Sequence, residues 1–184
     1  MISVMSSPYN NFVGKIWDHF EFMDELRYSE NKDVPQGSLE DLLKNQYHNF
    51  VTHRKPLYHL SKMIEKYAEN NGVPLVATFE KEARFNFVER RYYEMIDKIP
   101  KIWVVADFGK TDFHLSPKIN VLNCKNTELI NVWSVIARGP EGPFGLISEE
   151  FQDGRFRGFF TSNADVCAHA IETMEDILKS KIEI

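Results

Sequence analysis

Two short apolar runs with an amphipathic segment between them constrain the fold of this 184-residue chain more than any other feature. Residues 75–79 and 102–108 are apolar apart from Thr78 and Asp107 and are too brief for helices, which is typical of buried strands. Residues 81–98, between them, place apolar side chains at steps of three and four, and Pro100 ends that pattern. A strand, a helix and a strand within about 35 residues predict a βαβ unit. We therefore expect the two strands to be adjacent and parallel, joined by a right-handed crossover.

Downstream of this unit the pattern changes to strands that pair locally. Residues 131–139 and 142–150 are apolar runs on either side of a Gly-Pro-Glu-Gly sequence, which predicts a hairpin with a longer loop. Residues 118–123 and 158–161 are predicted as two more strands. The predicted fold is α/β: a mixed central sheet with a parallel βαβ unit and an antiparallel hairpin, flanked by helices. A GAF- or PAS-like α+β sensor fold, built on an antiparallel sheet, is the alternative.

The remaining helices are predicted from their ends. Residues 38–41 resemble a capping box, with aspartate in place of glutamate, and open a short helix. Residues 56–70 form a longer amphipathic helix that Gly72 ends as a left-handed cap. Ser162 and Asp165 resemble a second capping box, which predicts the start of the C-terminal helix.

Residues 1–50 are predicted to be a helical N-terminal extension, followed by one domain at residues 51–184. Apolar side chains recur near its start at helical spacing: Phe12, Ile16, Phe20 and Met23. Trp17 and Phe22 lie off that stripe, so we expect apolar surface on more than one side. The favoured interpretation is a helix packed on its own domain. The alternative is an arm at residues 9–28 that makes a homodimer or binds a partner.

Charge and cysteine usage narrow the class of protein. The formal net charge is -5 and no basic block is present, which disfavours nucleic-acid binding. No apolar run is long enough to cross a membrane, and no signal peptide is apparent. Cys124 and Cys167 are isolated in the sequence and predict reduced thiols in a cytoplasm, with a disulfide between them as the minor alternative. We expect a soluble, cytoplasmic protein.

Catalytic motifs are absent from the sequence. The six histidines include no H-E-x-x-H pair, and neither G-x-S-x-G nor a glycine-rich phosphate loop occurs. The sequence therefore predicts no catalytic residues and no metal site, and it identifies no cofactor. We expect that the protein is not an enzyme, with an enzyme carrying an unrecognised site as the least favoured reading.

A candidate ligand site lies after the second strand of the βαβ unit. Loops that follow parallel strands form a crevice, and Asp107 and Gly109 stand at this point. Arg138 would bring a cation to the same rim if its strand runs in the required direction. Arg91 and Tyr92 could contribute from the helix. The competing interpretation makes Asp107 the cap of a turn, Arg91 a solvated charge and Tyr92 a core residue.

Short motifs follow one another in a fixed order between residues 54 and 178. They are Leu60-Ser61-x-x-Ile64-Glu65, Pro74-Leu-Val-x-x-Phe79, Glu89-Arg90-Arg91-Tyr92, Val104-Val105-Ala106-Asp107-Phe108, Trp133-x-Val135 and Gly139-Pro140, then Arg155-Phe156 ahead of a strand, a threonine and the last helix. In this order they resemble the DICT sensory domain, which is found in diguanylate cyclases and two-component systems. One departure is Val132, which stands where that family has an acidic residue before the tryptophan.

The resemblance implies a stand-alone DICT sensory domain. Such a module would bind a small ligand or a signalling partner such as a histidine kinase or a cyclase, in light or redox signalling. It implies no catalytic residues, because the family is not regarded as an enzyme. A protein–protein adaptor without a ligand, docking through its aromatic N-terminal segment, is the alternative function.

Overall fold

The computed structural model describes residues 11–23, 32–34, 37–44, 46–109, 116–139 and 142–184. The helices are α1 (Phe12–His19), α2 (Leu39–Leu43), α3 (Arg54–Asn71), α4 (Glu82–Met95), a 3-10 turn η1 (Glu128–Asn131) and α5 (Ala164–Leu178). The strands are β1 (Tyr47–His53), β2 (Leu75–Lys81), β3 (Ile102–Asp107), β4 (Ile119–Asn123), β5 (Val132–Gly139), β6 (Gly142–Gln152) and β7 (Arg155–Thr161).

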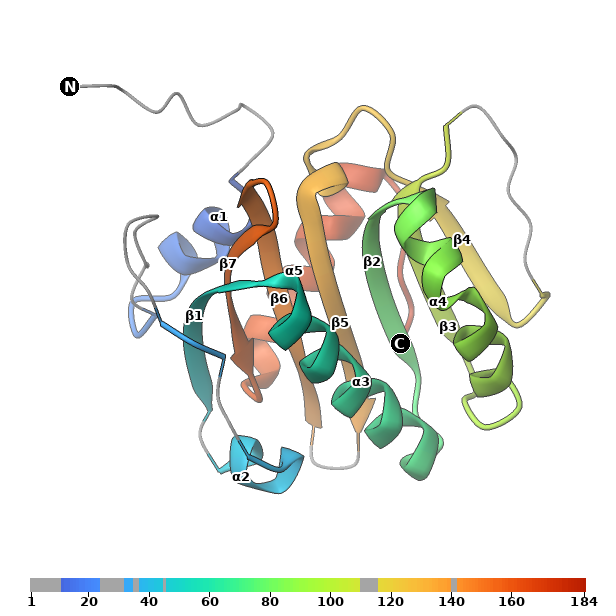
Figure 1. Cartoon of the computed structure of the whole chain (residues 1–184), viewed down its shortest axis with the longest axis horizontal. Helices are drawn as coiled ribbons and strands as arrows, with labels where there is room; N and C mark the ends of the chain where they lie inside the picture. Colours follow the sequence, from blue (N-terminus) through green and yellow to red (C-terminus); the bar gives the residue numbers. More distant parts are fainter. Residues whose placement is uncertain (1–10, 24–31, 35–36, 45, 110–115, 140–141) are drawn as a thin grey trace.

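The strands form one mixed sheet in the order β1-β7-β6-β5-β2-β3-β4 (Figure 1). β2, β3 and β4 are parallel, and the pairs from β1 to β2 along the sheet are antiparallel. This confirms the predicted fold class, including the parallel βαβ unit and the β5–β6 hairpin. The parallel strands also separate the fold from the antiparallel sheet of the GAF- or PAS-like alternative.

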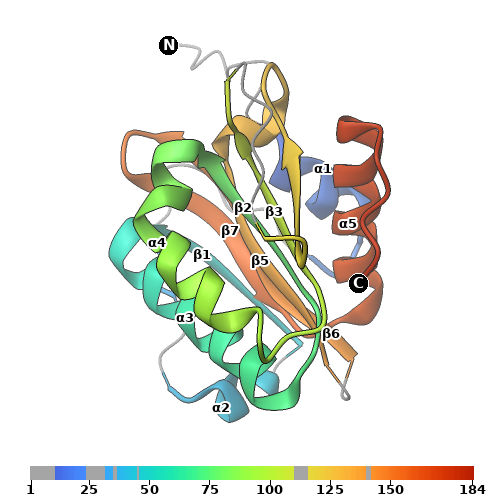
Figure 2. The same ribbon diagram turned by 90° about the vertical axis from the view of Figure 1, so that its right-hand side faces the viewer.

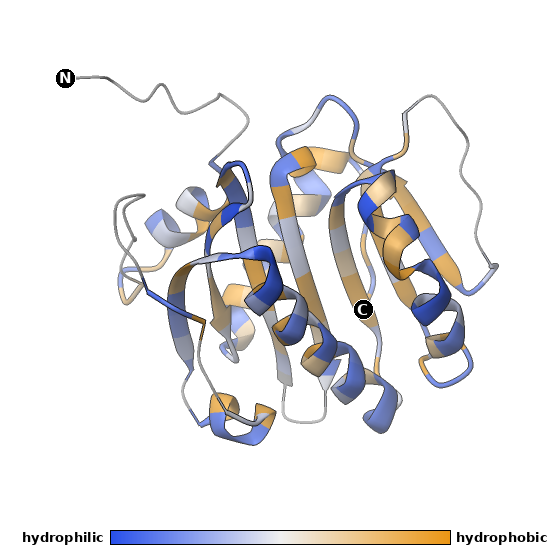
Figure 3. Ribbon diagram, in the orientation of Figure 1, coloured by the Kyte–Doolittle hydropathy of each residue, from blue (hydrophilic) through white to orange (hydrophobic). Residues whose placement is uncertain are grey.

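Helices cover both faces of the sheet. α3 and α4 lie on one face with α2 at its margin, while α1 and α5 lie on the other (Figure 2). Each face buries a separate apolar cluster, because successive side chains of a strand point to opposite sides. Val76 thus belongs to the α1/α5 side and its neighbour Ala77 to the α3/α4 side. Figure 3 shows polar residues concentrated on the outer surfaces of α3 and α4.

Two of the three predicted helix caps have the expected form. Ser38 and Asp41 make a reciprocal capping box at the start of α2. Gly72 ends α3 in the left-handed conformation, with φ 60° and ψ 42°. The predicted cap of α5 is wrong by one residue. The Asn163 side chain accepts hydrogen bonds from the N–H groups of Asp165 and Val166. Ser162 does not cap the helix because its own N–H still donates to the Gln46 carbonyl beside the strands.

β1 was not predicted, and it crosses the expected boundary between residues 50 and 51. Its side chains are buried at four consecutive positions, so the alternation that marks a half-exposed strand is missing. β1 pairs along its whole length with β7. Lys32, from the predicted extension, forms a bridge to Val51 on its other side. Residues of the N-terminal 50 therefore contribute directly to the sheet.

α1 packs on its own domain, as the favoured interpretation proposed. Phe12, Ile16 and Trp17 are buried against the β6 and β7 side chains of that face. Trp17 is buried although it lies off the predicted stripe, because its indole N–H donates to Asn49 and its ring contacts Phe159. The remainder of the predicted dimer arm, residues 9–10 and 24–28, lies outside the described residues.

Cys124 and Cys167 are both free and buried, so the alternative of a disulfide between them is wrong. Within the described part of the chain, no helix combines the length and apolar character needed to cross a membrane.

Candidate functional site

The structure brings Asp107 and Gly109 together in a turn at the end of β3. An Asp107 carboxylate oxygen accepts the Gly109 N–H at 2.8 Å, and Gly109 has a φ of 68°. Asn123 ties the same turn to β4 by accepting the Phe108 N–H and donating to the Gly109 carbonyl. The Asp107 carboxylate thus caps the turn, which is the competing interpretation of this residue.

Arg138 lies at the opposite end of the sheet, so the predicted shared rim is wrong. β5 runs antiparallel to β2, and the Arg138 N–H donates to the carbonyl of Pro74, just before β2 begins. The Arg138 guanidinium donates to the Ile184 carbonyl at 2.6 Å. The direction of β5 therefore separates this cation from Asp107.

Arg91 and Tyr92 meet a carboxylate that the sequence did not single out as a site residue. Arg91 donates to both oxygens of Glu65 on α3, at 2.7 and 3.1 Å, and to the Tyr58 hydroxyl at 2.9 Å. Tyr92 is fully buried and donates its hydroxyl to Glu65 at 2.8 Å. Tyr92 is therefore a core residue, while Arg91 is an ion-paired side chain between two helices rather than a solvated charge.

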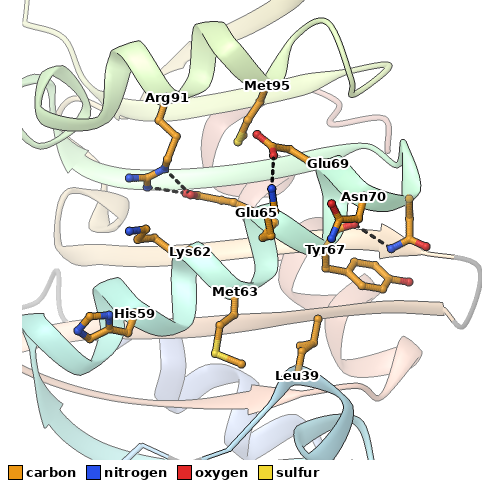
Figure 4. Close-up of a pocket in the computed structure, with 12 residues that line it drawn as sticks. Leu39, His59, Lys62, Met63, Glu65, Tyr67, Glu69, Asn70, Arg91 and Met95 are labelled. Atoms are coloured by element: carbon orange, nitrogen blue, oxygen red, sulfur yellow. Dashed lines mark hydrogen bonds and ion pairs between the residues drawn. The ribbon is translucent and has the colours of Figure 1, made fainter.

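The Glu65–Arg91 pair separates two pockets between α3 and α4. A pocket of about 460 Å³ lies on the side of the helix N-termini, and we call it the α3–α4 pocket. A second, more open pocket of about 760 Å³ lies on the side of the C-termini and reaches Leu39 beside α2 (Figure 4). Both Glu65 and Arg91 line each pocket.

Four aromatic side chains line the α3–α4 pocket. Phe79 on β2 and Trp133 on β5 are directly opposite each other in the strand ladder. The Trp133 indole N–H donates to the Ser61 hydroxyl of α3 at 3.1 Å. Tyr58 and Phe87 face each other from the two helices, with ring centroids 6.5 Å apart. Phe87 is 83% exposed, which is unusual for a phenylalanine in an ordered helix.

Glu80 closes the pocket at the carboxyl end of β2 in a strained conformation. Its φ is 67°, in the left-handed region that costs a non-glycine residue of order 1 kcal/mol or more. Its buried carboxylate accepts a hydrogen bond from Arg54 at 3.0 Å, and Arg54 also pairs with Glu150 on β6. The Arg54 guanidinium lies 4.8 Å from the centre of the Phe156 ring. Three elements thus hold one arginine at the pocket.

Burial has the largest effect on the pKa values of the Glu65 and Glu80 carboxyls. Removal from water raises the pKa of Glu65, against the opposing effect of its hydrogen bonds and charge contact with Arg91. The pKa of Glu80 is raised for the same reason, with Arg54 as the opposing cation. Burial, followed by the negative charge of Glu65, raises the pKa of Tyr92 well above its ordinary value. In each carboxylate the arginine therefore offsets part of the effect of burial.

The arrangement suits binding of a ligand. A mostly apolar concave surface with a few fixed polar groups is typical of small-molecule sites. Among the described residues, no group of three His, Cys, Asp or Glu side chains could hold a metal ion.

Comparison with known proteins gives little further information. No protein-family model and no curated protein matches the chain. One solved structure, NucT from Helicobacter pylori, matches with a TM-score of 0.44 and 10% identity, over 75% of this chain and 99% of that chain. NucT is a nuclease, so the prediction that the protein is not an enzyme is contradicted and is withdrawn. At this TM-score the likeness assigns no activity to the chain.

One of the five predicted site residues, Arg91, lines the α3–α4 pocket. Tyr92 lies in the core and donates a hydrogen bond to Glu65, which lines the pocket. The other three do not line it: Asp107, Gly109 and Arg138. Residue-by-residue reasoning did not single out Arg54, Glu80 or Phe87 as site residues. The sequence offered one signal for Glu80, because it is a polar residue directly after an apolar strand. The same signal led to Asp107 on the next strand.

Proposed function

We propose that this protein is a regulatory domain that binds a small ligand in the α3–α4 pocket. The observation that carries the proposal is the pocket itself: aromatic walls, two buried carboxylates, each held by an arginine, and a strained residue at its end. Such strain is concentrated at functional sites in proteins. The resemblance to the DICT sensory domain supports the same reading, with a histidine kinase or a cyclase as the partner that receives the signal.

Arg54 is the side chain through which an occupied pocket would act on the rest of the sheet. It lines the pocket and pairs with Glu150 on β6, whose carboxylate also accepts the Gly154 N–H in the turn before β7. A ligand that draws Arg54 away from Glu150 would loosen this turn. The β6–β7 turn is therefore the proposed output of ligand binding.

The adaptor alternative has less support. An adaptor without a ligand would need no pocket and would dock through its N-terminal aromatic residues. A pocket is present, and Phe12, Ile16 and Trp17 are buried in their own domain. The cytoplasmic location belongs to this proposal and is supported by two buried free thiols, which are typical of a reducing compartment.

Native mass spectrometry tests the proposal on the full chain, incubated with a metabolite extract of its own cells. Ala83→Trp fills the pocket from an exposed lining position on α4, and Asn86→Trp adds the same side chain one turn along, outside the lining. A ligand mass should be retained by the wild type and by Asn86→Trp but lost from Ala83→Trp. Equal retention by all three proteins, or no retained ligand on the wild type, would contradict the proposal.

A further inference from the structure

The α3–α4 pocket has an excess of positive charge. Four cationic side chains line it, Arg54, Lys55, Arg84 and Arg91, against the two carboxylates of Glu65 and Glu80. Each carboxylate accepts hydrogen bonds from one arginine, so Arg54 and Arg91 are the paired cations. Among the lining residues the surplus is two positive charges, or one when Glu150, the second partner of Arg54, is counted, in a chain whose formal net charge is -5.

Lys55 and Arg84 are the two cations that make up the surplus. Lys55 lies in the first turn of α3 and Arg84 in the first turn of α4, so they approach the pocket from different helices. Both are exposed, and neither forms an ion pair among the described residues, although the charge of Arg84 also acts on the nearby Glu80 carboxylate. Both charges are therefore available to a ligand.

The aromatic residues define what lies next to this charge. Tyr58 and Phe87 flank the gap between the helices, and Phe79 and Trp133 lie on the sheet beneath it. A flat ring placed between these two pairs would contact aromatic faces on both sides and would cover Phe87, which is otherwise 83% exposed. The aliphatic residues that line the pocket are Val88 and Ala83.

We infer that the ligand is a small aromatic anion, with its ring between the aromatic side chains and its negative charge at Lys55 and Arg84. The inference rests on the ligand-binding function proposed above. A cationic ligand is disfavoured because both carboxylates already accept hydrogen bonds from arginines and the surplus charge would repel it. A neutral ring would leave the two free cations unused.

Isothermal titration calorimetry with three probes of one shape tests this inference on the full chain. The probes are 1-naphthoate, 1-naphthamide and 1-naphthylmethylammonium, which carry negative, zero and positive charge on the same ring system. We expect naphthoate to bind about tenfold more tightly than the other two at low ionic strength. The double variant K55Q/R84Q should lose that tenfold preference and bind naphthamide as the wild type does.

The matched control is K66Q/R90Q, which removes the same charge from the same two helices at positions outside the α3–α4 pocket. It should keep the preference for naphthoate. If naphthamide or the ammonium probe binds the wild type as tightly as naphthoate, if K55Q/R84Q keeps the preference, or if no probe binds, the anion inference is wrong.

Ala83→Trp separates that failure from failure of the proposed function. Loss of all probe binding in Ala83→Trp, without any preference for the anion in the wild type, would leave the pocket as the ligand site and refute only the ligand class. Naphthoate binding that persists undiminished in Ala83→Trp would place the site elsewhere and would overturn both proposals.

Discussion

Glu65 joins the two helices that enclose the pocket. Its carboxylate accepts hydrogen bonds from Arg91 and Tyr92 of α4 while its own side chain is only 3% exposed. A buried charge held in this way is costly to leave unpaired, by about 3–5 kcal/mol. Glu65 therefore links α3 to α4 through hydrogen bonds to two side chains of α4.

Substitution of Glu65 by glutamine should change the pH dependence of stability. The folded-state pKa of Glu65 is raised by burial above its ordinary value of 4.5, so the folded protein holds this proton more tightly than the unfolded chain. The contribution of the Glu65 carboxyl to the free energy of unfolding is fully present below pH 4.5. It is lost as the pH rises through the folded-state pKa of Glu65. Relative to Glu65→Gln, the wild type should become less stable across that window.

Urea unfolding of both proteins between pH 4 and pH 8 measures this difference. Arg91→Gln is the second variant: removal of the guanidinium raises the pKa of Glu65 further, so the loss of stability should continue to a higher pH and be larger in total. A difference between wild type and Glu65→Gln that is constant, or that grows in favour of the wild type as the pH rises, would contradict the prediction.

At the scale of elements, the N-terminal helix α1 is held by a buried charge on the sheet. One oxygen of Glu149 on β6 accepts the Val13 N–H in the first turn of α1, and the other accepts Arg157 of β7 at 2.9 Å. Arg157 in turn lies over the ring of Trp17. A carboxylate at a helix N-terminus satisfies a free N–H group and interacts favourably with the helix dipole.

Glu149→Ala should therefore release α1 and lower the free energy of unfolding by about 3–5 kcal/mol, because Arg157 loses its buried ion-pair partner. Glu149→Gln keeps an acceptor for Val13 and should cost less. Urea unfolding measures both, and limited proteolysis within residues 12–23 reports release of the helix.

The matched control for α1 is Glu128→Gln. This substitution removes the ion pair of Lys15, a side chain of α1 that is 52% exposed, and should cost less than about 1 kcal/mol. If Glu149→Ala and Glu128→Gln have equal effects, the buried carboxylate does not anchor α1.

At the scale of the whole molecule, the two free thiols report on the cluster beneath α1 and α5. Cys124 and Cys167 belong to this one cluster although they lie in different parts of the chain. Burial raises the pKa of each thiol to about 12. A thiol reacts through its thiolate, so both should be inert while the cluster stays closed.

Titration with 5,5′-dithiobis(2-nitrobenzoate) tests this prediction. Neither thiol should react in the native protein within the time in which both react in 6 M guanidinium chloride. In urea below the unfolding transition, the two reaction rates should rise with the same denaturant dependence as global unfolding. Fast reaction of one thiol in native buffer would mean that its part of the cluster opens locally.

Local patterns were sufficient for the elements around the pocket. The spacing of apolar side chains predicted α3 and α4 close to their observed bounds, and Gly72 marked the end of α3. The two buried strands of the βαβ unit were predicted as a parallel pair, which the register of β2 on β3 confirms. β1 escaped prediction because four consecutive buried positions do not alternate.

The candidate site was only partly accessible to sequence reasoning. Arg91 was named for the right helix, but its partner Glu65 is 26 positions away, and Arg54 reaches Glu150 across 96 positions. Arg138 was assigned to the rim on the condition that its strand ran in the required direction. Pairing with β2 sets the opposite direction, which no local pattern reveals.

The sequence by itself determined most of the helices and strands, β1 excepted, since periods of 3.6 and 2 and the residues at element ends act within a few positions. The tertiary structure decided the order of the strands, the direction of β5 and the meeting of Arg54 with Glu80 and Glu150. These depend on hydrogen bonds and packing between segments far apart in the chain. Several strand orders satisfy the same local pattern, and only the packed sheet selects one.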